Sequence, residues 1–377
     1  METREPKKGR GVPKETPAQN SIADLARALA AYCPAPDGAR VPDALARRGF
    51  FAAGMVEQIR IMAETAVELV DSCGGAAAVI DALAASPAEK VRGVAAFAVP
   101  IVYAGDLDAQ LKGLRFTGAL DGTWPRELSV TTLHNLIIAH GVEAVLPRVR
   151  GWIADPDPAV RRLVVEAFRP RGVMLAHIDE LKRDPAPLKA LLEPLLDDES
   201  DYVRKAVANN LNDIAKTNPD TVLAWAGAWL TPDASEARRW IINRGLRTLV
   251  NDGHPAALKL LGYAPAAMLR VTWLEGTPQR VAINQLLPFA FDVHNPSRAD
   301  VPVILVLLMD EPGKGDARRR RRYRLWQGVV KAGETRSVQK RIHFVDMTRQ
   351  LREPGTYRLT VTVNGETLAS REMLFAR

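Results

Sequence analysis

The sequence predicts a multidomain protein in which an all-α solenoid of HEAT-like repeats is followed by an all-β immunoglobulin-like sandwich. Two observations favour this fold class. Apolar residues recur at helical spacing from residue 21 to about residue 265, and from residue 270 onwards they alternate at the two-residue period of half-buried strands. We therefore expect a disordered basic tail (residues 1–20), a HEAT-like helical domain (residues 21–265) and an Ig-like β-sandwich (residues 270–377).

Three helix openings in the helical domain resemble one another. Each places acidic or hydroxyl capping residues before a Val-Arg pair, at Arg92, Arg161 and Arg204. The last two arginines are 43 residues apart, a separation typical of HEAT-type repeats built from paired helices. Such pairs stack into a curved solenoid with a concave face, a shape suited to cradling a duplex.

The β-domain carries short alternating segments separated by turn signals. Strands are expected at residues 271–273, 286–293, 301–309 and 357–363. The pair Asn364-Gly365 directly follows the last of them and is a strong signal for a hairpin turn. About seven short strands over roughly 100 residues fit an immunoglobulin-like sandwich.

Positive charge is concentrated in the β-domain. The whole chain has a net charge of +7, and residues 270–377 hold 19 Lys and Arg against 11 Asp and Glu, so this domain carries the entire basic excess. Such asymmetry indicates a polyanionic partner, with nucleic acid as the first candidate. The densest basic group comprises Arg318, Arg319, Arg320, Arg321, Arg322 and Arg324. We expect it to form a loop between two strands that contacts DNA phosphates, the alternative being a solvated hairpin loop.

Several classes of function lack support in the sequence. No apolar run reaches the ~18 residues of a membrane span, and no apolar segment of a secretory signal follows the basic N-terminus. The histidines, Cys33 and Cys73 do not show the spacing of a zinc site, and two cysteines make no disulfide framework. We therefore expect a cytoplasmic protein that uses no metal and no cofactor.

The helix expected between Asp198 and Pro219 is the most informative stretch. Its apolar face consists of Val203, Val207, Leu211 and Ile214. Its polar face consists of Lys205, Asn209, Asn212, Asp213 and Lys216. Because the Asn amide competes with backbone hydrogen bonds, several Asn residues in one helix are costly unless they hold something polar. The alternative is an ordinary solvated face.

Carboxylates on helices are the remaining candidates for chemistry. Asp157 caps a helix on which Glu166 shares a face with Arg162 and, just beyond the helix, Arg169. Taken alone, Glu166 is expected to form a surface ion pair that contributes little. Glu127 follows closely on a helix start, where the helix dipole favours an acid in any case.

Stretches in at least four places of the chain resemble the AlkC branch of the AlkC/AlkD family of DNA-alkylation-repair glycosylases. In the helical domain they are Val-Arg-Arg-Leu-Val-Val-Glu-Ala-Phe-Arg-Pro-Arg (160–171), Val-Arg-Lys-Ala-Val-Ala-Asn-Asn-Leu-Asn-Asp-Ile-Ala-Lys (203–216) and Arg-Arg-Trp (238–240) with Leu-Arg-Thr-Leu-Val (246–250). In the β-domain, Lys-Arg-Ile-His (340–343) and Pro-Gly-Thr-Tyr (354–357) resemble the Ig-like domain that some AlkC proteins carry. The resemblance covers roughly residues 120–377.

The resemblance implies a monofunctional glycosylase of base excision repair. Such an enzyme would remove cationic N-alkylated bases, notably 3-methyladenine with 3-methylcytosine as a further candidate, from double-stranded DNA without base flipping. Glu127, Glu166 and Asp213 match the family's acidic residues near the lesion. The expected DNA contacts of the helical domain are Asn209, Asn210, Arg162, Arg169, Arg171 and Lys205. A monomer associated with a bacterial nucleoid is expected.

The chain also departs from the family pattern. Met174 stands where the family commonly has Trp, and Thr131 replaces a usual Arg. Met is polarizable but offers no π face for a cationic base or sugar. The alternative hypothesis is therefore a catalytically diverged HEAT-repeat DNA-binding protein that recognises damaged or branched DNA. A third hypothesis, a protein-interaction scaffold, is opposed by the basic charge of the β-domain.

Overall fold

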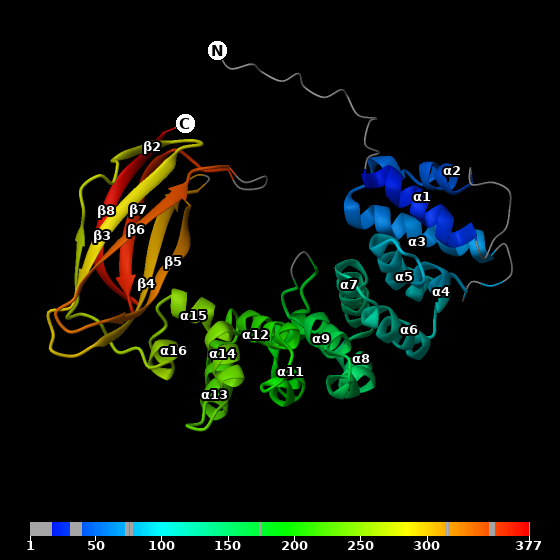
Figure 1. Cartoon of the computed structure of the whole chain (residues 1–377), viewed down its shortest axis with the longest axis horizontal. Coiled ribbons are helices and arrows are strands. Elements are labelled where there is room, and N and C mark those ends of the chain that lie inside the picture. Colours follow the sequence, from blue (N-terminus) through cyan, green and yellow to red (C-terminus); the bar gives the residue numbers. More distant parts are fainter. Residues whose placement is uncertain are drawn as a thin grey trace, which may run out of the picture. The chain divides into compact units, whose positions relative to one another are not determined.

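Helices come first along the chain and strands second (Figure 1). The structure is a computed structural model, and it describes residues 17–30, 40–71, 75, 78–172, 175–313, 315, 317–346 and 351–376. By internal packing the chain forms two compact units that divide after Asn210, inside helix α12 (Asp201–Ala215). The described helices include none that is both long enough and apolar enough to cross a membrane.

The first unit consists of helices that stack in chain order. Its helices before α12 are α1 (Pro17–Ala30), α2 (Arg40–Arg47), α3 (Met55–Asp71), α4 (Ala78–Ala84), α5 (Glu89–Val102), α6 (Leu107–Ala119), α7 (Thr123–His140), α8 (Val142–Val149), α9 (Pro158–Ala167), α10 (Asp179–Arg183) and α11 (Ala186–Leu192). The helices α3, α5, α7 and α9 lie side by side (Figure 1). Helix α1 begins at Pro17, four residues before the predicted start of the helical domain. Residues 1–16 and both cysteines lie outside the described residues.

The three similar helix openings fold alike. In each, Nη1 of the arginine donates to two carbonyl oxygens of the loop that precedes its helix, at 2.9–3.0 Å for Arg92, 2.9–3.1 Å for Arg161 and 2.8–2.9 Å for Arg204. The arginine therefore satisfies backbone acceptors that the loop leaves without partners. Arg161 also binds both carboxylate oxygens of Asp198, at 2.7 and 3.0 Å, and so ties the opening of α9 to that of α12. The repeated Val-Arg pairs are thus structural.

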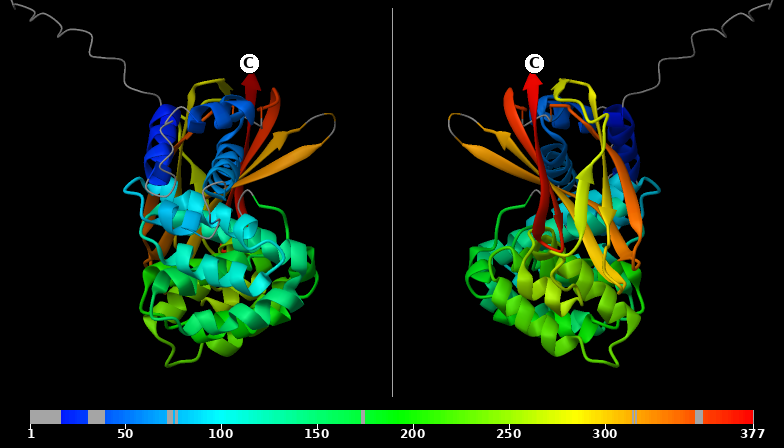
Figure 2. Two further views of the ribbon diagram at one scale, coloured as in Figure 1. Left: turned by 90° about the vertical axis from the view of Figure 1, so that its right-hand side faces the viewer. Right: turned by 90° about the vertical axis from the view of Figure 1, so that its left-hand side faces the viewer.

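The second unit contains the remaining helices and the β-sandwich. Its helices after α12 are α13 (Pro219–Trp229), α14 (Glu236–Gly245), α15 (Arg247–Asn251) and α16 (Pro255–Leu260). Its strands are β1 (Arg270–Trp273), β2 (Arg280–Ala282), β3 (Leu286–His294), β4 (Val301–Pro312), β5 (Arg318–Val330), β6 (Thr335–His343), β7 (Gly355–Val363) and β8 (Glu366–Ala376). They form one sheet of order β1-β3-β6 and one of order β2-β8-β7-β4-β5. The strands are drawn in yellow to red in Figure 2. The predicted order of an all-α region and an Ig-like β-region is confirmed.

The turn between β7 and β8 has the predicted hairpin conformation. Asn364 and Gly365 have φ values of 49° and 83°, the left-handed conformation that a tight hairpin turn requires. The Asn364 side chain donates to the carbonyl oxygen of Ala264 at 2.8 Å. Gly365 also meets Gly253, where an added Cβ would lie 2.7 Å from the Cα of Gly365. This backbone contact holds the hairpin against the segment after α15.

The arginine run is not a loop. All six arginines belong to strand β5, which pairs in antiparallel fashion with β4 (Figure 2, orange). Acids neutralise much of the run: Arg320 binds Asp310 at 2.6 Å, Arg321 binds the fully buried Glu311 at 2.7 Å, and Arg322 pairs with Asp252. The hydrogen bond from Arg320 holds the pKa of Asp310 below its usual range. Cross-strand pairing with acidic partners therefore allows so many arginines in one strand.

Candidate active site

Most of the predicted carboxylate site lines one cleft of about 430 Å³ in the first unit. Helices α3, α7, α9 and α12 all contribute to it. Its polar lining includes Glu127, Arg162, Glu166, Arg169 and Asn209. Five residues that the sequence separates by up to 82 positions are thus brought to one concave surface. Pro158 occupies the first turn of α9, and Asp157 caps this helix by accepting the amide hydrogen of Ala159 at 2.8 Å, as predicted.

Two carboxylates and two guanidinium groups alternate across this cleft. Oε2 of Glu166 accepts a hydrogen bond from Nη1 of Arg169 at 2.9 Å, while its Oε1 lies 3.9 Å from Nη2 of Arg162. The same Nη2 donates to Oε1 of Glu127 at 2.7 Å. Glu166 is only 8% exposed, so the interpretation of its ion pair as a weak surface contact is wrong. A guanidinium group thus lies on each side of the Glu166 carboxylate.

Arg162 also contacts an aromatic ring that the sequence analysis did not single out. Its Cζ lies 4.2 Å from the ring centroid of Tyr202, and the Cζ of Arg126 lies 5.8 Å from the same centroid. Burial raises the pKa of the Tyr202 phenol. Tyr202 directly precedes Val203, the first residue of the apolar face of α12. This position is the sequence signal that could have identified Tyr202. Cation–π contact fixes the plane of the Arg162 guanidinium group.

The C-terminus of α9, next to Glu166, is held by side chains of two other helices. The Ala167 carbonyl lies 2.8 Å from Nδ1 of His134 on α7, and the Val165 carbonyl accepts a hydrogen bond from Nδ2 of Asn210 on α12 at 3.0 Å. Without these contacts the carbonyls would lack a partner, as is usual in the last turn of a helix. His134 and Asn210 are both fully buried. The expectation that Asn210 contacts DNA directly is therefore wrong.

Two of the three asparagines of α12 form hydrogen bonds with other parts of the protein. Asn210 holds the end of α9, and Oδ1 of Asn212 accepts hydrogen bonds from the amide and hydroxyl of Thr248 at 3.2 and 2.9 Å. Asn209 alone of the three lines the cleft. On the polar face of this helix Asn212 and Asp213 are buried and Lys205 and Lys216 are exposed, while Asn209 lines the cleft and is therefore the candidate for contact with a ligand.

The remaining predicted site residues have different surroundings. Asp213, in the second unit, is 1% exposed and accepts a hydrogen bond from Nζ of Lys216 at 2.8 Å. Lys205 is exposed and lies 3.7 Å from Asp201, and Arg171 is half-buried next to the described end of its loop. Met174, the substitution on which the departure from the family pattern depends, lies outside the described residues.

An apolar rim on α3 completes the cleft. Met55 and Val56 are 55% and 49% exposed, and both line the cleft together with Trp124 of α7. Exposed apolar side chains beside a polar cleft are typical of a surface that covers a ligand. The sequence alone does not predict this rim, because helical periodicity cannot separate a rim residue from a core residue.

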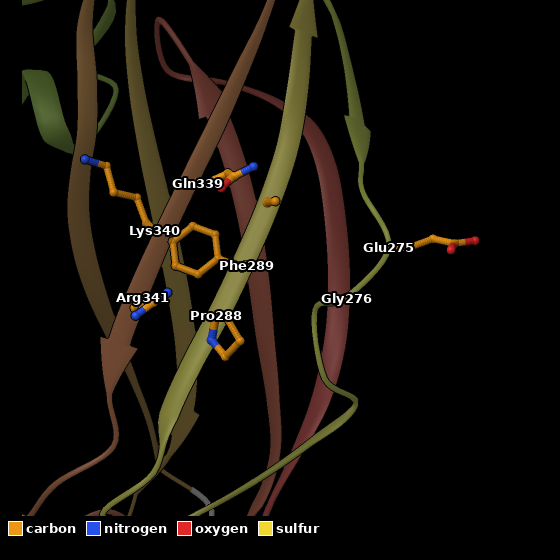
Figure 3. A pocket seen from close by; sticks show the side chains of 8 residues that line it. Glu275, Gly276, Pro288, Phe289, Gln339, Lys340 and Arg341 are labelled. Carbon is orange, nitrogen blue, oxygen red and sulfur yellow. The ribbon is translucent and has the colours of Figure 1, made fainter.

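A second concave surface, of about 450 Å³, lies on the smaller sheet of the sandwich. Figure 3 shows Lys340 and Arg341 on β6 beside Pro288 and Phe289 on β3. The two cations belong to the Lys-Arg-Ile-His stretch that carries part of the resemblance. They add positive charge to this face of the domain.

Known protein families match two parts of the chain. Residues 127–249 match the family described as DNA alkylation repair enzyme, and residues 270–376 match the family described as the C-terminal Ig-like domain of the uncharacterised protein YhaZ. The chain thus carries one part similar to alkylation-repair enzymes and one part similar to the YhaZ-type Ig-like domain. The first match contains Glu127, Glu166 and Asp213.

Two relatives extend these matches. The uncharacterized protein YhaZ of Bacillus subtilis (strain 168) is 34% identical over 224 residues, which are 59% of this chain and 62% of YhaZ. The match thus spans less than two thirds of that relative. The alkylpurine DNA glycosylase AlkC of Pseudomonas fluorescens, solved bound to DNA containing an abasic site analog, aligns with a TM-score of 0.83 at 22% identity over 95% of this chain and 98% of AlkC. The chain therefore has an AlkC-like fold.

Proposed function

We propose that this protein is a monofunctional DNA glycosylase of base excision repair. It hydrolyses the bond between deoxyribose and a cationic N-alkylated base, such as 3-methyladenine or 3-methylcytosine, in double-stranded DNA. The observation that supports this most is Glu166, a carboxylate set into a concave cleft between Arg162 and Arg169, within the stretch that matches alkylation-repair enzymes.

The chemistry follows from the charge of the alkylated base. When the bond from C1′ to the ring nitrogen breaks, its electron pair leaves with the base and neutralises it. The sugar is left as an oxocarbenium-like cation, as in glycoside hydrolysis. Water then forms a bond to C1′ and gives up a proton. A fixed carboxylate can stabilise the cation and accept that proton.

Glu166 is the residue best placed for this role. Its Oε2 is held by Arg169 at 2.9 Å, which fixes the orientation of the carboxylate. Its Oε1 lies 3.9 Å from Arg162, beyond hydrogen-bonding distance, and can therefore accept a hydrogen bond from water. Glu127, bound to the other side of Arg162, adds a second negative charge at the cleft.

Asp213 is proposed as the further carboxylate. It follows Asn209 by four residues on α12, so the two side chains lie on one side of that helix. Its carboxylate is buried and paired with Lys216. A catalytic role therefore requires that this pair open when DNA binds.

Cleavage without base flipping is part of the proposal. Enzymes that extrude a base hold it in a snug pocket and bear the cost of unstacking it. In this chain the carboxylates line a cleft with an exposed apolar rim of Met55 and Val56. Such a rim is suited to packing against the surface of a duplex.

Release of free base from methylated duplex DNA tests the proposal. The expected result is time-dependent release of 3-methyladenine by the wild-type protein, and its loss in Asp213→Asn with retained DNA binding. A wild-type protein that binds this DNA and releases no base would support the second candidate, a catalytically diverged DNA-binding protein. The burial of Asp213 against Lys216 favours that alternative.

A further inference from the structure

A pocket rich in arginine lies in the second unit and shares no lining residue with the cleft that contains Glu127 and Glu166. Its volume is about 410 Å³. We call it the arginine pocket, and it is lined by Arg239, Trp240, Asn243, Arg244, Arg247 and Arg324. None of these six residues carries a carboxylate. Four come from α14, Arg247 begins α15, and Arg324 is the last member of the β5 run.

Among the described residues, the hydrogen-bond partners of Arg324 and Arg239 in this pocket are neutral groups rather than acids. Nε of Arg324 donates to Oδ1 of Asn251 at 2.9 Å, and Nη1 of Arg247 donates to the carbonyl oxygen of Arg244 at 2.8 Å. Arg239 donates to the carbonyl oxygens of Ala234 and Pro232 at 3.0 and 2.6 Å. These contacts orient the guanidinium groups and leave their positive charge in place.

The contrast with the rest of β5 is direct. Arg320, Arg321 and Arg322 pair with Asp310, Glu311 and Asp252. Arg324 instead joins other arginines, and burial lowers the pKa of its guanidinium group. Several like charges in one partly buried pocket repel one another, and a bound anion would relieve that repulsion. Arg324 is therefore a member of the β5 run whose positive charge remains available to an anion.

An exposed aromatic ring lies beside these charges. Trp240 is 39% exposed, and the Cζ of Arg244 lies 5.5 Å from its ring centroid. A phosphate group alone needs no apolar neighbour. A nucleic-acid strand presents a phosphate and an apolar sugar side by side, and the arginine pocket offers a matching surface for each.

We propose that the arginine pocket binds a backbone phosphate of duplex DNA, with Trp240 packed against the adjoining deoxyribose. This inference rests on the proposed function in one respect, namely that DNA is the partner. It assigns the DNA contact of strand β5 to Arg324 rather than to the ion-paired arginines before it.

The test is the salt dependence of binding to an undamaged duplex, measured by fluorescence anisotropy between about 50 and about 200 mM salt. Each lost phosphate contact lowers the slope of log K against log salt by about 0.9. Arg324→Gln and Arg244→Gln are each expected to show this loss, and Arg324→Lys, which keeps the charge, to retain the wild-type slope. Trp240→Ala should weaken binding about fivefold at an unchanged slope, because an apolar contact releases no counterion.

Arg320→Gln is the matched control, because it removes the same charge from the same strand at a site where Asp310 already neutralises it. Its slope is expected to equal that of the wild type. A wild-type slope in both Arg324→Gln and Arg244→Gln, in variants whose melting temperatures show them folded, would overturn the proposal. So would an equal loss in Arg320→Gln, or displacement of DNA from the wild type by inorganic phosphate at low millimolar concentration. Because undamaged DNA is used, absence of glycosylase activity would leave these outcomes unaffected.

Discussion

Substitution of Asn210 tests how the candidate site is held together. Its side chain is 0% exposed and donates to the carbonyl oxygen of Val165 at 3.0 Å, next to Glu166 on α9. Asn210→Ala leaves that buried carbonyl without its donor, at a cost of about 1–3 kcal/mol. For a unit of 210 residues, each kcal/mol corresponds to roughly 2–4 °C. The melting temperature of the first unit should therefore fall by about 2–12 °C.

Thermal unfolding followed by far-ultraviolet circular dichroism measures this effect. Asn210→Asp keeps the size and shape of the side chain but replaces the amide group that donates, so it separates the loss of the hydrogen bond from the loss of packing and should also destabilise the protein. Lys205→Ala is the control on the same helix: its ion pair with Asp201 is exposed, so a change within about 0.5 kcal/mol is expected. If Asn210→Ala melts at the wild-type temperature, α12 does not anchor the end of α9.

Three further outcomes are expected. Arg162→Gln should slow base release about 10²-fold, because the carboxylates that Arg162 positions would be misplaced, while DNA binding is retained. Arg162→Lys should not restore the rate. A wild-type rate in either variant would exclude the positioning role. Asp310→Asn should lower the melting temperature near neutral pH. Because Arg320 depresses the pKa of Asp310 in the folded state, this difference should vanish as the pH falls below about 4, and a difference independent of pH would contradict the assignment. Gly253→Ala should destabilise more than Gly262→Ala, since both have positive φ but only Gly253 meets backbone within 4 Å; equal melting temperatures would refute the contact.

The helical and strand periodicity of the apolar residues predicts most of the fold, namely a helical region followed by a β-region. The β7–β8 hairpin can be predicted because its tight turn needs two residues with positive φ, and Asn364-Gly365 supplies them. The start of α9 can be predicted because Asp157 is a residue type that caps helices. The sequence shows that the Val-Arg openings are similar to one another. It does not show that their arginines bind loop carbonyl groups, because the loop that contains the two acceptors of Arg161 has no sequence signature.

The misjudged residues share a cause. Arg319 to Arg322 are accommodated in a strand because acids on β4 and in the turn after α15 pair with them, and such long-range partners cannot be predicted from a run of charges. Asn210 and Asp213 were assigned to a ligand-facing surface because helical periodicity gives the face of a residue and not what covers that face. Tyr202 and Met55 were missed since each joins the site only through packing of distant helices.

The most direct test of the central claim is the single-turnover rate of 3-methyladenine release from methylated duplex DNA by Glu166→Gln. Loss of one preorganised electrostatic group should reduce this rate about 10²- to 10³-fold while DNA affinity stays near the wild-type value. Glu143→Gln, the same change at an exposed position on α8, should release base at the wild-type rate. Equal rates for wild type and Glu166→Gln would contradict the assignment of Glu166 as the carboxylate that stabilises the departing sugar.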